Sequence, residues 1–241
     1  MINPIPLEIC INAAHVKQAA KAASYGNADR IELCSQMDVG GLTPSTEAIK
    51  LARQAFPKPG LMVMIRPRAG DFVYSLREQR QMFASIHDAK AAGADGVVLG
   101  ALKDDAIDVD LTKNLVQEAQ SLGLSVTFHR AFDAVSNRTR ALEHLIEIGV
   151  DRVLSSGTAW GSGVPAHRGL TVLEALCNQA AGRLELVVGG GVTLATLPTI
   201  LSALTHCPRI AIHVYTAAQA HGLTSVPAVT KLQQALANAA D

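Results

Sequence analysis

Short apolar runs alternate with longer amphipathic segments along almost the whole chain. Eight runs of four to six residues, rich in Val, Ile and Leu, have the pattern of buried strands. They are Leu7–Ile11, Arg30–Cys34, Leu61–Arg66, Gly96–Gly100, Ser125–His129, Arg152–Ser155, Glu185–Val188 and Arg209–His213. Helical spacing predicts a helix after each run, near residues 13–24, 45–55, 76–92, 110–121, 137–148, 168–181, 194–204 and 227–239, with start signals at Thr43-Pro44-Ser45 and Ser136. Eight alternating units in 241 residues predict a (β/α)8 TIM barrel, built as one domain over residues 1–241.

A short repeat precedes the second, fourth and sixth predicted strands. Gly26-Asn27-Ala28-Asp29 recurs as Gly93-Ala94-Asp95 and as Gly149-Val150-Asp151. A glycine at a helix end suits a positive φ, and the aspartate stands where the next strand begins. We therefore expect the three aspartates to stabilise the N-terminal face of the barrel, opposite the face that carries active sites.

Composition and charge exclude several classes of protein. Hydrophobic residues make up 49% of the chain and aromatic residues 4%, which argues against a disordered chain and favours a helix-covered parallel sheet. The 21 basic residues balance the 21 acidic ones without a basic run, so we expect no nucleic-acid partner. No segment has the pattern of a membrane span or of a signal peptide. With no CxxC spacing, the four cysteines suit a cytoplasmic protein whose thiols are all reduced: Cys10, Cys34, Cys177 and Cys207.

Side-chain alternation predicts an unusually polar barrel lumen. The apolar positions of each strand should face the helices, so the other positions point inward. The inward set is Glu8, Cys10, Glu32, Cys34, Met62, Met64, Arg66, Thr127, His129, Leu154, Ser156, Ala211 and His213, with Arg68 just beyond its strand. Buried carboxylates need partners. Either Glu8 and Glu32 pair with Arg66 and Arg68 in a purely structural network, or these groups form a ligand site at the C-terminal ends of the strands.

Four ordered motifs resemble the CutC copper homeostasis family over about residues 7 to 214. They are Ala28-Asp29-Arg30-Ile31-Glu32-Leu33-Cys34, Gly40-Gly41-Leu42-Thr43-Pro44-Ser45, Met64-Ile65-Arg66-Pro67-Arg68-Ala69-Gly70-Asp71-Phe72 and Val126-Thr127-Phe128-His129-Arg130-Ala131-Phe132-Asp133. The resemblance implies a TIM barrel, a cytoplasmic location, a homodimer or higher homo-oligomer, and a role in handling Cu(I). It also implies that the copper ligands are Cys10 and Cys34.

The two cysteines leave three interpretations open. Neighbouring strands lie about 4.8 Å apart, so two thiols at matched heights can share one soft ion, and thiolates prefer Cu(I). They can equally be inert core residues or form a redox disulfide. We expect Met62 and Met64 to fill the core. Copper homeostasis is the predicted function, with Cu(I) as the expected ligand and no other cofactor.

The alternative prediction is a barrel enzyme that acts on a small anionic metabolite. Arg66 and Arg68 would grip a carboxylate or phosphate, and His129 would exchange protons near neutral pH. Glu8, Glu32 or Asp133 would act as a base or orient one. The further candidates for anion binding are Ser156, Gly189, Gly190, Gly191 and His213. The glycine run can bind phosphate through backbone N–H groups, or can serve only loop sterics.

The sequence departs from the family pattern around the mouth of the predicted barrel. An extra stretch, Thr158–Pro165, follows the sixth strand, the seventh ends in Val187-Val188-Gly189, and Tyr215 follows the eighth. We expect a mouth of altered size, with Trp160 and Tyr215 either contacting a ligand or capping the barrel. The other histidines are expected at the surface: His15, His87, His144, His167, His206 and His221.

Overall fold

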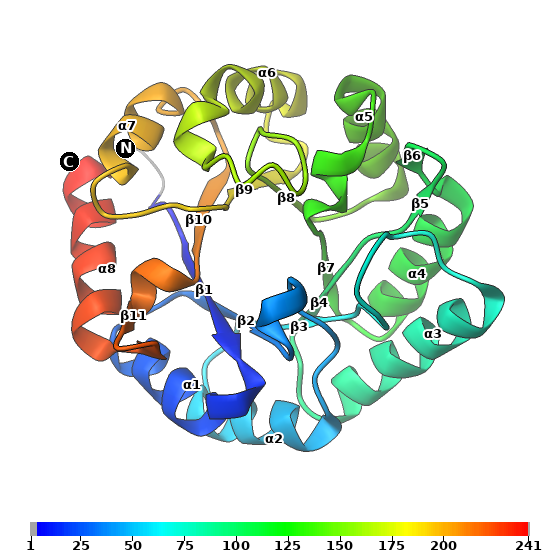
Figure 1. Cartoon of the computed structure of the whole chain (residues 1–241), viewed down its shortest axis with the longest axis horizontal. Helices are drawn as coiled ribbons and strands as arrows, with labels where there is room; N and C mark the ends of the chain where they lie inside the picture. Colours follow the sequence, from blue (N-terminus) through cyan, green and yellow to red (C-terminus); the bar gives the residue numbers. More distant parts are fainter. Residues whose placement is uncertain (1–3, 241) are drawn as a thin grey trace.

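Eight parallel strands close into a barrel in the computed structural model, which describes residues 4–240 (Figure 1). Neighbouring strands follow in chain order, and the last pairs with the first. The strands are β1 (Leu7–Asn12), β2 (Arg30–Cys34), β3 (Leu61–Met64), β4 (Gly96–Leu99), β7 (Ser125–Phe128), β8 (Arg152–Ser155), β9 (Glu185–Val188) and β10 (Ile210–Val214). The predicted TIM barrel is confirmed.

Helices surround the barrel on its outer side (Figure 1). They are α1 (Val16–Tyr25), α2 (Thr46–Ala55), α3 (Leu76–Ala91), α4 (Val109–Ser121), α5 (Arg138–Ile148), α6 (Leu170–Ala180), α7 (Leu197–Ala203) and α8 (Val226–Ala240). Ser45 caps α2 as predicted, but Asn137 and not Ser136 caps α5, because the Asn137 side chain accepts from the Arg140 backbone N–H at 2.9 Å. None of the helices described between residues 4 and 240 is long and apolar enough to cross a membrane.

Short elements that the sequence pattern did not predict build up the loops. Two-stranded hairpins follow β4 and β10, and 3-10 helices follow β1, β2, β7, β8 and β10. The hairpins are β5 (Leu102–Lys103) with β6 (Ala106–Ile107) and β11 (Gln219–Ala220) with β12 (Leu223–Thr224). The 3-10 helices are η1 (Ala13–His15), η2 (Met37–Val39), η3 (Arg130–Ala134), η4 (Ala166–Arg168) and η5 (Thr216–Ala218). Runs of two to five residues are too short to show a hydrophobic period.

Strand parity divides the apolar residues as predicted. The outward positions of the strands pack beneath the helices in one large buried cluster, which includes Ile9, Ile31 and Val63. The inward positions form separate lumen clusters. Their buried members are Cys10, Cys34, Met62, Met64 and Val98 in one cluster and Leu154, Val187 and Ala211 in the other.

The repeated aspartates hold the N-terminal rim of the barrel, as expected. Asp29 accepts from the Leu7 backbone N–H at 2.8 Å, and Asp151 accepts from that of Val126 at 2.7 Å. Asp95 accepts in the same way from residues 60 and 61 at 2.7 and 2.9 Å. The expected positive φ occurs at Gly93 and Gly149 but not at Gly26 (φ −75°), because Asn27 takes the left-handed conformation there.

Near the starts of the strands, the buried charged groups of the lumen do not form the ion pairs that the sequence suggested. Glu8 bonds to Arg30 at 3.0 Å, and Arg30 reaches Glu185 at 2.6 Å. Arg152 lies 3.5 Å from the same Glu185 oxygen. Arg30 stands at the start of β2, directly beside Glu8 in the register of the sheet, whereas Arg66 lies beyond the end of β3. Glu8 therefore pairs with an arginine at a strand start, and Glu32 contacts His213; neither pairs with Arg66 or Arg68.

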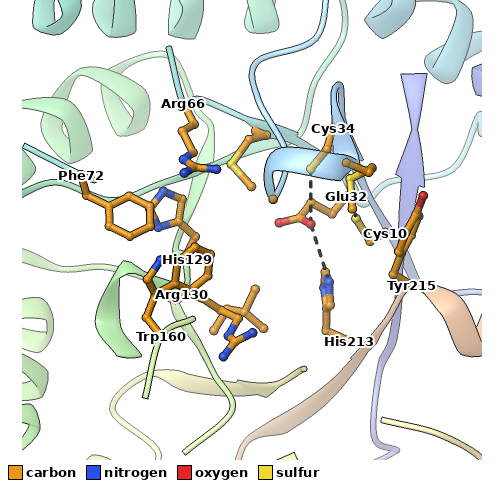
Figure 2. Close-up of a pocket in the computed structure, with 14 residues that line it drawn as sticks. Cys10, Glu32, Cys34, Arg66, Phe72, His129, Arg130, Trp160, His213 and Tyr215 are labelled. Atoms are coloured by element: carbon orange, nitrogen blue, oxygen red, sulfur yellow. Dashed lines mark hydrogen bonds and ion pairs between the residues drawn. The ribbon is translucent and has the colours of Figure 1, made fainter. Parts of the chain in front are cut away.

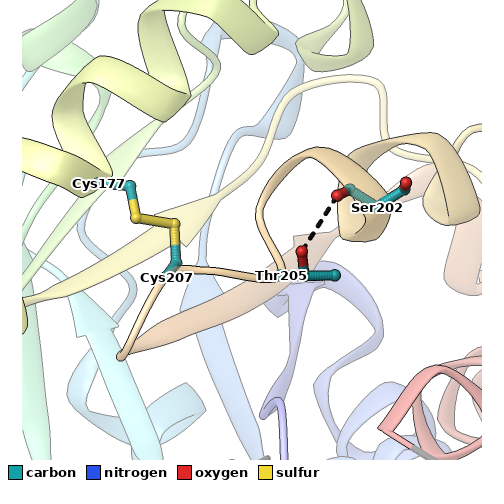
Figure 3. Close-up of a disulfide and its surroundings, with 4 residues drawn as sticks. All are labelled: Cys177, Ser202, Thr205 and Cys207. Atoms are coloured by element: carbon teal, nitrogen blue, oxygen red, sulfur yellow. Dashed lines mark hydrogen bonds between the residues drawn. A yellow bond between two sulfur atoms is a disulfide. The ribbon is translucent and has the colours of Figure 1, made fainter.

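Two of the four cysteines form a disulfide, which corrects the expectation of four reduced thiols. Cys177 of α6 is bonded to Cys207, which precedes β10 (Figure 3). Their Cα atoms lie 5.7 Å apart, although 30 residues separate them in sequence. Only the fold brings them together. Cys10 and Cys34 are free.

Candidate functional site

A cavity of about 170 Å³ opens at the C-terminal mouth of the barrel (Figure 2). Its lining divides into two regions. The sulfur side consists of Cys10, Glu32, Cys34, Met37, Met64, His213 and Tyr215. The guanidinium side consists of Arg66, Phe72, His129, Arg130 and Trp160, and Gly40 and Leu154 complete the wall.

The sulfur side brings two free thiols and a carboxylate together. The ligand atoms of Cys10, Glu32 and Cys34 all lie within 4.8 Å of one another, and all three residues are buried. Cys10 pairs with Glu32 in the register of β1 with β2, and Cys34 lies two residues further along β2. The Cys34 thiol donates to Glu32 Oε2 at 3.6 Å. The two cysteines therefore lie close together, as predicted.

Met37 is a further soft donor that the sequence interpretation missed. Its Sδ lies 3.9 Å from Cys10 Sγ. Met37 begins η2, and the chain returns through Gly40 and Gly41, both with positive φ near 85°. A Cβ on Gly41 would lie 3.1 Å from Cys34 Sγ, so glycine permits this close return. The Gly40-Gly41 pair soon after Cys34 is the sequence signal that indicates the turn.

Both thiols keep their protons at neutral pH. A hydrogen bond with Cys34, together with burial, raises the pKa of Cys10 well above its usual value. The corresponding bond with Cys10 lowers the pKa of Cys34, but burial and the nearby Glu32 carboxylate outweigh it and raise that pKa to about 11. Such thiols are poor nucleophiles. A metal ion that binds them must displace their protons.

His213 forms an ion pair behind the thiols. Its Nδ1 lies 2.8 Å from Glu8 and its Nε2 lies 3.7 Å from Glu32. Burial opposes protonation, but the Glu32 carboxylate, a hydrogen bond with Cys10 and the contact with Glu8 raise the pKa of His213 well above its usual value. Burial also opposes ionisation of Glu8, yet the hydrogen bond from His213 and the charge of Arg30 lower the Glu8 pKa to about 2. His213 is thus a cation that neutralises buried acids, so neither ring nitrogen is free to bind a metal.

Arg66 dominates the guanidinium side and pairs only with neutral groups. It is 2% exposed and donates to the carbonyls of Val39, Gly41 and Gly70 at 3.0 to 3.2 Å. Its guanidinium carbon lies 5.0 Å from the centre of the Phe72 ring. Among the salt bridges of residues 4–240, none involves Arg66.

His129 lies next to Arg66 and stays neutral. Burial, and next the charge of Arg66, lower the pKa of His129 to about 3. Its Nδ1 accepts from the Ala131 backbone N–H at 3.2 Å, so the proton resides on Nε2. Nε2 is buried and has no protein partner. His129 is therefore a neutral donor at pH 7, contrary to the expectation that it exchanges protons there.

Arg130 and Trp160 close this side of the cavity. Arg130 Nε donates to Asp133 at 2.8 Å and Nη2 donates to Ser156 at 2.7 Å. Its guanidinium carbon lies 5.3 Å from the Trp160 ring, which the extra stretch Thr158–Pro165 supplies. Asp133 also accepts from both Ser155 and Ser156, so it anchors Arg130 and is not a free base.

Two other predicted anion-binding groups are not brought to the cavity. Arg68 bonds to Glu78 and to Asp71, both at 2.7 Å, near the start of α3, and the predicted joint grip with Arg66 is absent. The glycine run Gly189–Gly191 packs closely: a Cβ on Gly190 would lie 3.0 Å from Ser156 Cβ, and one on Gly191 would lie 2.9 Å from Pro165 Cβ. These contacts give a steric reason for glycine at both positions, and phosphate binding by the backbone N–H groups stays a prediction. None of the six histidines expected at the surface is buried or lines the cavity.

The sequence profile of the CutC family matches residues 5–206. The chain belongs to the CutC family. A CutC family protein of Bacteroides thetaiotaomicron is 43% identical to it over 81% of this chain and 75% of its own length. A human protein, named copper homeostasis protein cutC homolog, is 44% identical over 83% of this chain and 70% of its own.

Solved structures agree with this CutC assignment. The crystal structure of CutC from Streptococcus agalactiae has a TM-score of 0.78 and 33% identity, covering 87% of this chain and 98% of that chain. A 3-keto-L-gulonate-6-phosphate decarboxylase from Vibrio cholerae, at 15% identity and a TM-score of 0.64 over 98% of this chain and 99% of that one, shares the barrel fold alone. The resemblance recognised from the four motifs is confirmed.

Proposed function

We propose that this CutC family member serves copper homeostasis by binding Cu(I) through Cys10 and Cys34. The observation that carries the proposal is the convergence of two free, buried thiols, with ligand atoms within 4.8 Å, at the mouth of the barrel. Relatives at more than 40% identity bear the name copper homeostasis protein, which supports the same role.

The donor set suits a soft monovalent ion. Thiolates and thioethers favour Cu(I), whereas Mg²⁺ and Ca²⁺ require a shell of oxygen atoms. The sulfurs of Cys10, Cys34 and Met37 lie on one side of the cavity, and the carboxylate beside them, Glu32, already contacts Cys34 and His213. Since the metal must displace both thiol protons, the affinity should rise with pH.

An anaerobic Cu(I) titration against a competing chelator tests the proposal. We expect wild-type protein to bind one equivalent, and Cys10→Ser with Cys34→Ser to abolish that binding. Met37→Leu, which removes only a neutral thioether, should weaken it less. The matched control is Cys177→Ser with Cys207→Ser, which removes the other cysteine pair and should leave Cu(I) affinity unchanged. Unchanged binding by the Cys10 and Cys34 variant would overturn the proposal.

The alternative prediction of an enzyme has less support. Arg68 lies outside the cavity, and His129 is held neutral near pH 7. A cytoplasmic location and a homodimer or larger homo-oligomer remain predictions from the resemblance.

A further inference from the structure

Arg66 is a buried cation without a carboxylate partner. Within residues 4–240, its bonds go to three backbone carbonyls and its Nε has no acceptor. An uncompensated charge in a protein interior is energetically unfavourable. Neutral carbonyls offset part of that cost, but they leave the net charge of the site unchanged.

The remaining charged groups of the lumen compensate one another. Glu8 and Glu32 flank His213, and Glu185 lies between Arg30 and Arg152. On the guanidinium side, Asp133 neutralises Arg130. Among residues 4–240, Arg66 is therefore the lumen arginine that no carboxylate contacts.

Free donors accompany this charge. His129 is 4% exposed and keeps Nε2–H without a partner, while Nδ1 is committed to Ala131. Arg130 uses Nε and Nη2 on Asp133 and Ser156, which leaves Nη1 for another acceptor. A neutral histidine adds a donor without adding a second charge.

Aromatic rings link these groups into one wall. The Phe72 ring centre lies 5.0 Å from that of His129 and 5.2 Å from that of Trp160, and Figure 2 shows Arg66 and Arg130 on the same side of the cavity. The wall thus offers apolar faces beside the polar donors. A cavity of about 150 Å³ lined by apolar groups accommodates benzene. The whole cavity, sulfur side included, measures about 170 Å³ and is therefore large enough for a small organic molecule.

We propose that the guanidinium side binds a small organic monocarboxylate, whose single negative charge compensates Arg66 and whose oxygens accept from His129 and Arg130. One uncompensated charge fits a monoanion better than a phosphate dianion. The aromatic faces of Phe72 and Trp160 contact the apolar part of the ligand. The thiols line the opposite side of the same cavity, and the proposal does not require copper to be bound there.

Titration calorimetry with sodium benzoate, sodium acetate and inorganic phosphate tests this site. We expect one equivalent of benzoate to bind more tightly than acetate because of the aromatic wall, and phosphate to bind least. Arg66→Gln should weaken benzoate binding at least tenfold. Because this variant removes three buried hydrogen bonds and can fail to fold, His129→Phe provides a second test: it keeps a ring, removes the Nε2 donor and should weaken binding severalfold.

Control variants separate this proposal from the copper proposal. Arg68→Ala removes a guanidinium that lies outside the cavity and should change benzoate affinity less than twofold. Cys10→Ser with Cys34→Ser should lose Cu(I) and keep benzoate. The proposal is overturned if neither carboxylate binds, if phosphate binds best, or if folded Arg66→Gln and His129→Phe both bind benzoate as wild type does. It is also overturned if Arg66→Gln weakens only Cu(I) binding, since Arg66 would then balance a copper dithiolate.

Discussion

The two sides of the cavity carry buried charge in opposite ways. Behind the thiols, Glu8 and Glu32 share the imidazolium of His213, and Arg30 completes the pairing. On the other side, Arg66 donates three hydrogen bonds to backbone carbonyls but contacts no carboxylate among residues 4–240. Hydrogen bonds are thus present on both sides, whereas the paired charges of the two sides lie behind the thiols and between Arg130 and Asp133.

This difference changes what each side can receive. The charges behind the thiols are paired within the protein, so the sulfur side offers neutral thiols and a thioether to a soft cation. The guanidinium side holds a charge that an incoming anion would balance.

The largest effect on stability is expected from Glu8→Gln. It leaves Arg30 and His213 without a shared acid in the lumen, and breaking a buried pair costs about 3–5 kcal/mol. Denaturant unfolding should show this loss in the free energy of unfolding. Glu143→Gln, which disrupts an exposed pair with Arg183, is the control and should show little change. A Glu8 variant as stable as the wild type would show that the ion pairs are not what holds this region.

The second-largest effect should come from acid, which removes the contribution of ionised Glu8 to the free energy of unfolding. The folded-state pKa of Glu8 is about 2, below the usual 4.5, so its stabilising effect is fully present above pH 4.5 and is lost as the pH falls towards 2. The difference in unfolding free energy between wild type and Glu8→Gln should therefore shrink over that window. A difference independent of pH would contradict the assignment of the stabilising effect to the ionised carboxylate.

Arg66→Gln should have a smaller and purely local effect on His129. Burial is the larger cause of the lowered pKa and remains, while the charge of Arg66 disappears. The pKa of His129 should rise above about 3 and stay below 6.5, as NMR titration of the ring would show. No rise would mean that the two side chains are not electrostatically coupled.

Arg68→Ala should have the smallest effect. Arg68 is partly exposed and already pairs with Asp71 and Glu78, so its loss should cost about 0–1 kcal/mol in unfolding free energy. It should leave the His129 pKa unchanged. A shift in that pKa as large as the one from Arg66→Gln would erase the distinction between the two arginines.

The barrel could be predicted because each strand and helix shows its own pattern within a short stretch of sequence. A period of two fixes which side of a strand is buried, and the predicted strand bounds lie within two residues of those observed. The same parity placed Cys10, Cys34 and His213 in the lumen. Sequence periodicity therefore yields the direction in which a side chain points.

The partners of these side chains depend on the closed barrel and were mostly missed. Arg30 was placed in β2 but not recognised as the partner of Glu8, because the pairing requires the register of β1 with β2. Cys10 contacts Met37 only because the turn after β2 brings the two sulfur atoms to 3.9 Å. Arg66 and Arg68 are two residues apart with the same chemistry, and only the loop geometry separates the buried one from the exposed one.

The aspartate repeat at the N-terminal rim has a consequence for how the barrel opens. Asp29-Arg30-Ile31 and Asp151-Arg152-Val153 have a counterpart before β10, Pro208-Arg209-Ile210, in which proline replaces the aspartate and supplies neither a carboxylate nor an N–H. The residue immediately before that proline is Cys207, which the disulfide ties to α6. The disulfide thus holds the part of the N-terminal rim before β10, where proline stands in place of the aspartate. If a reducing agent cleaves this bond, amide hydrogen exchange should quicken first in β9 and β10, at the end of the barrel opposite its mouth.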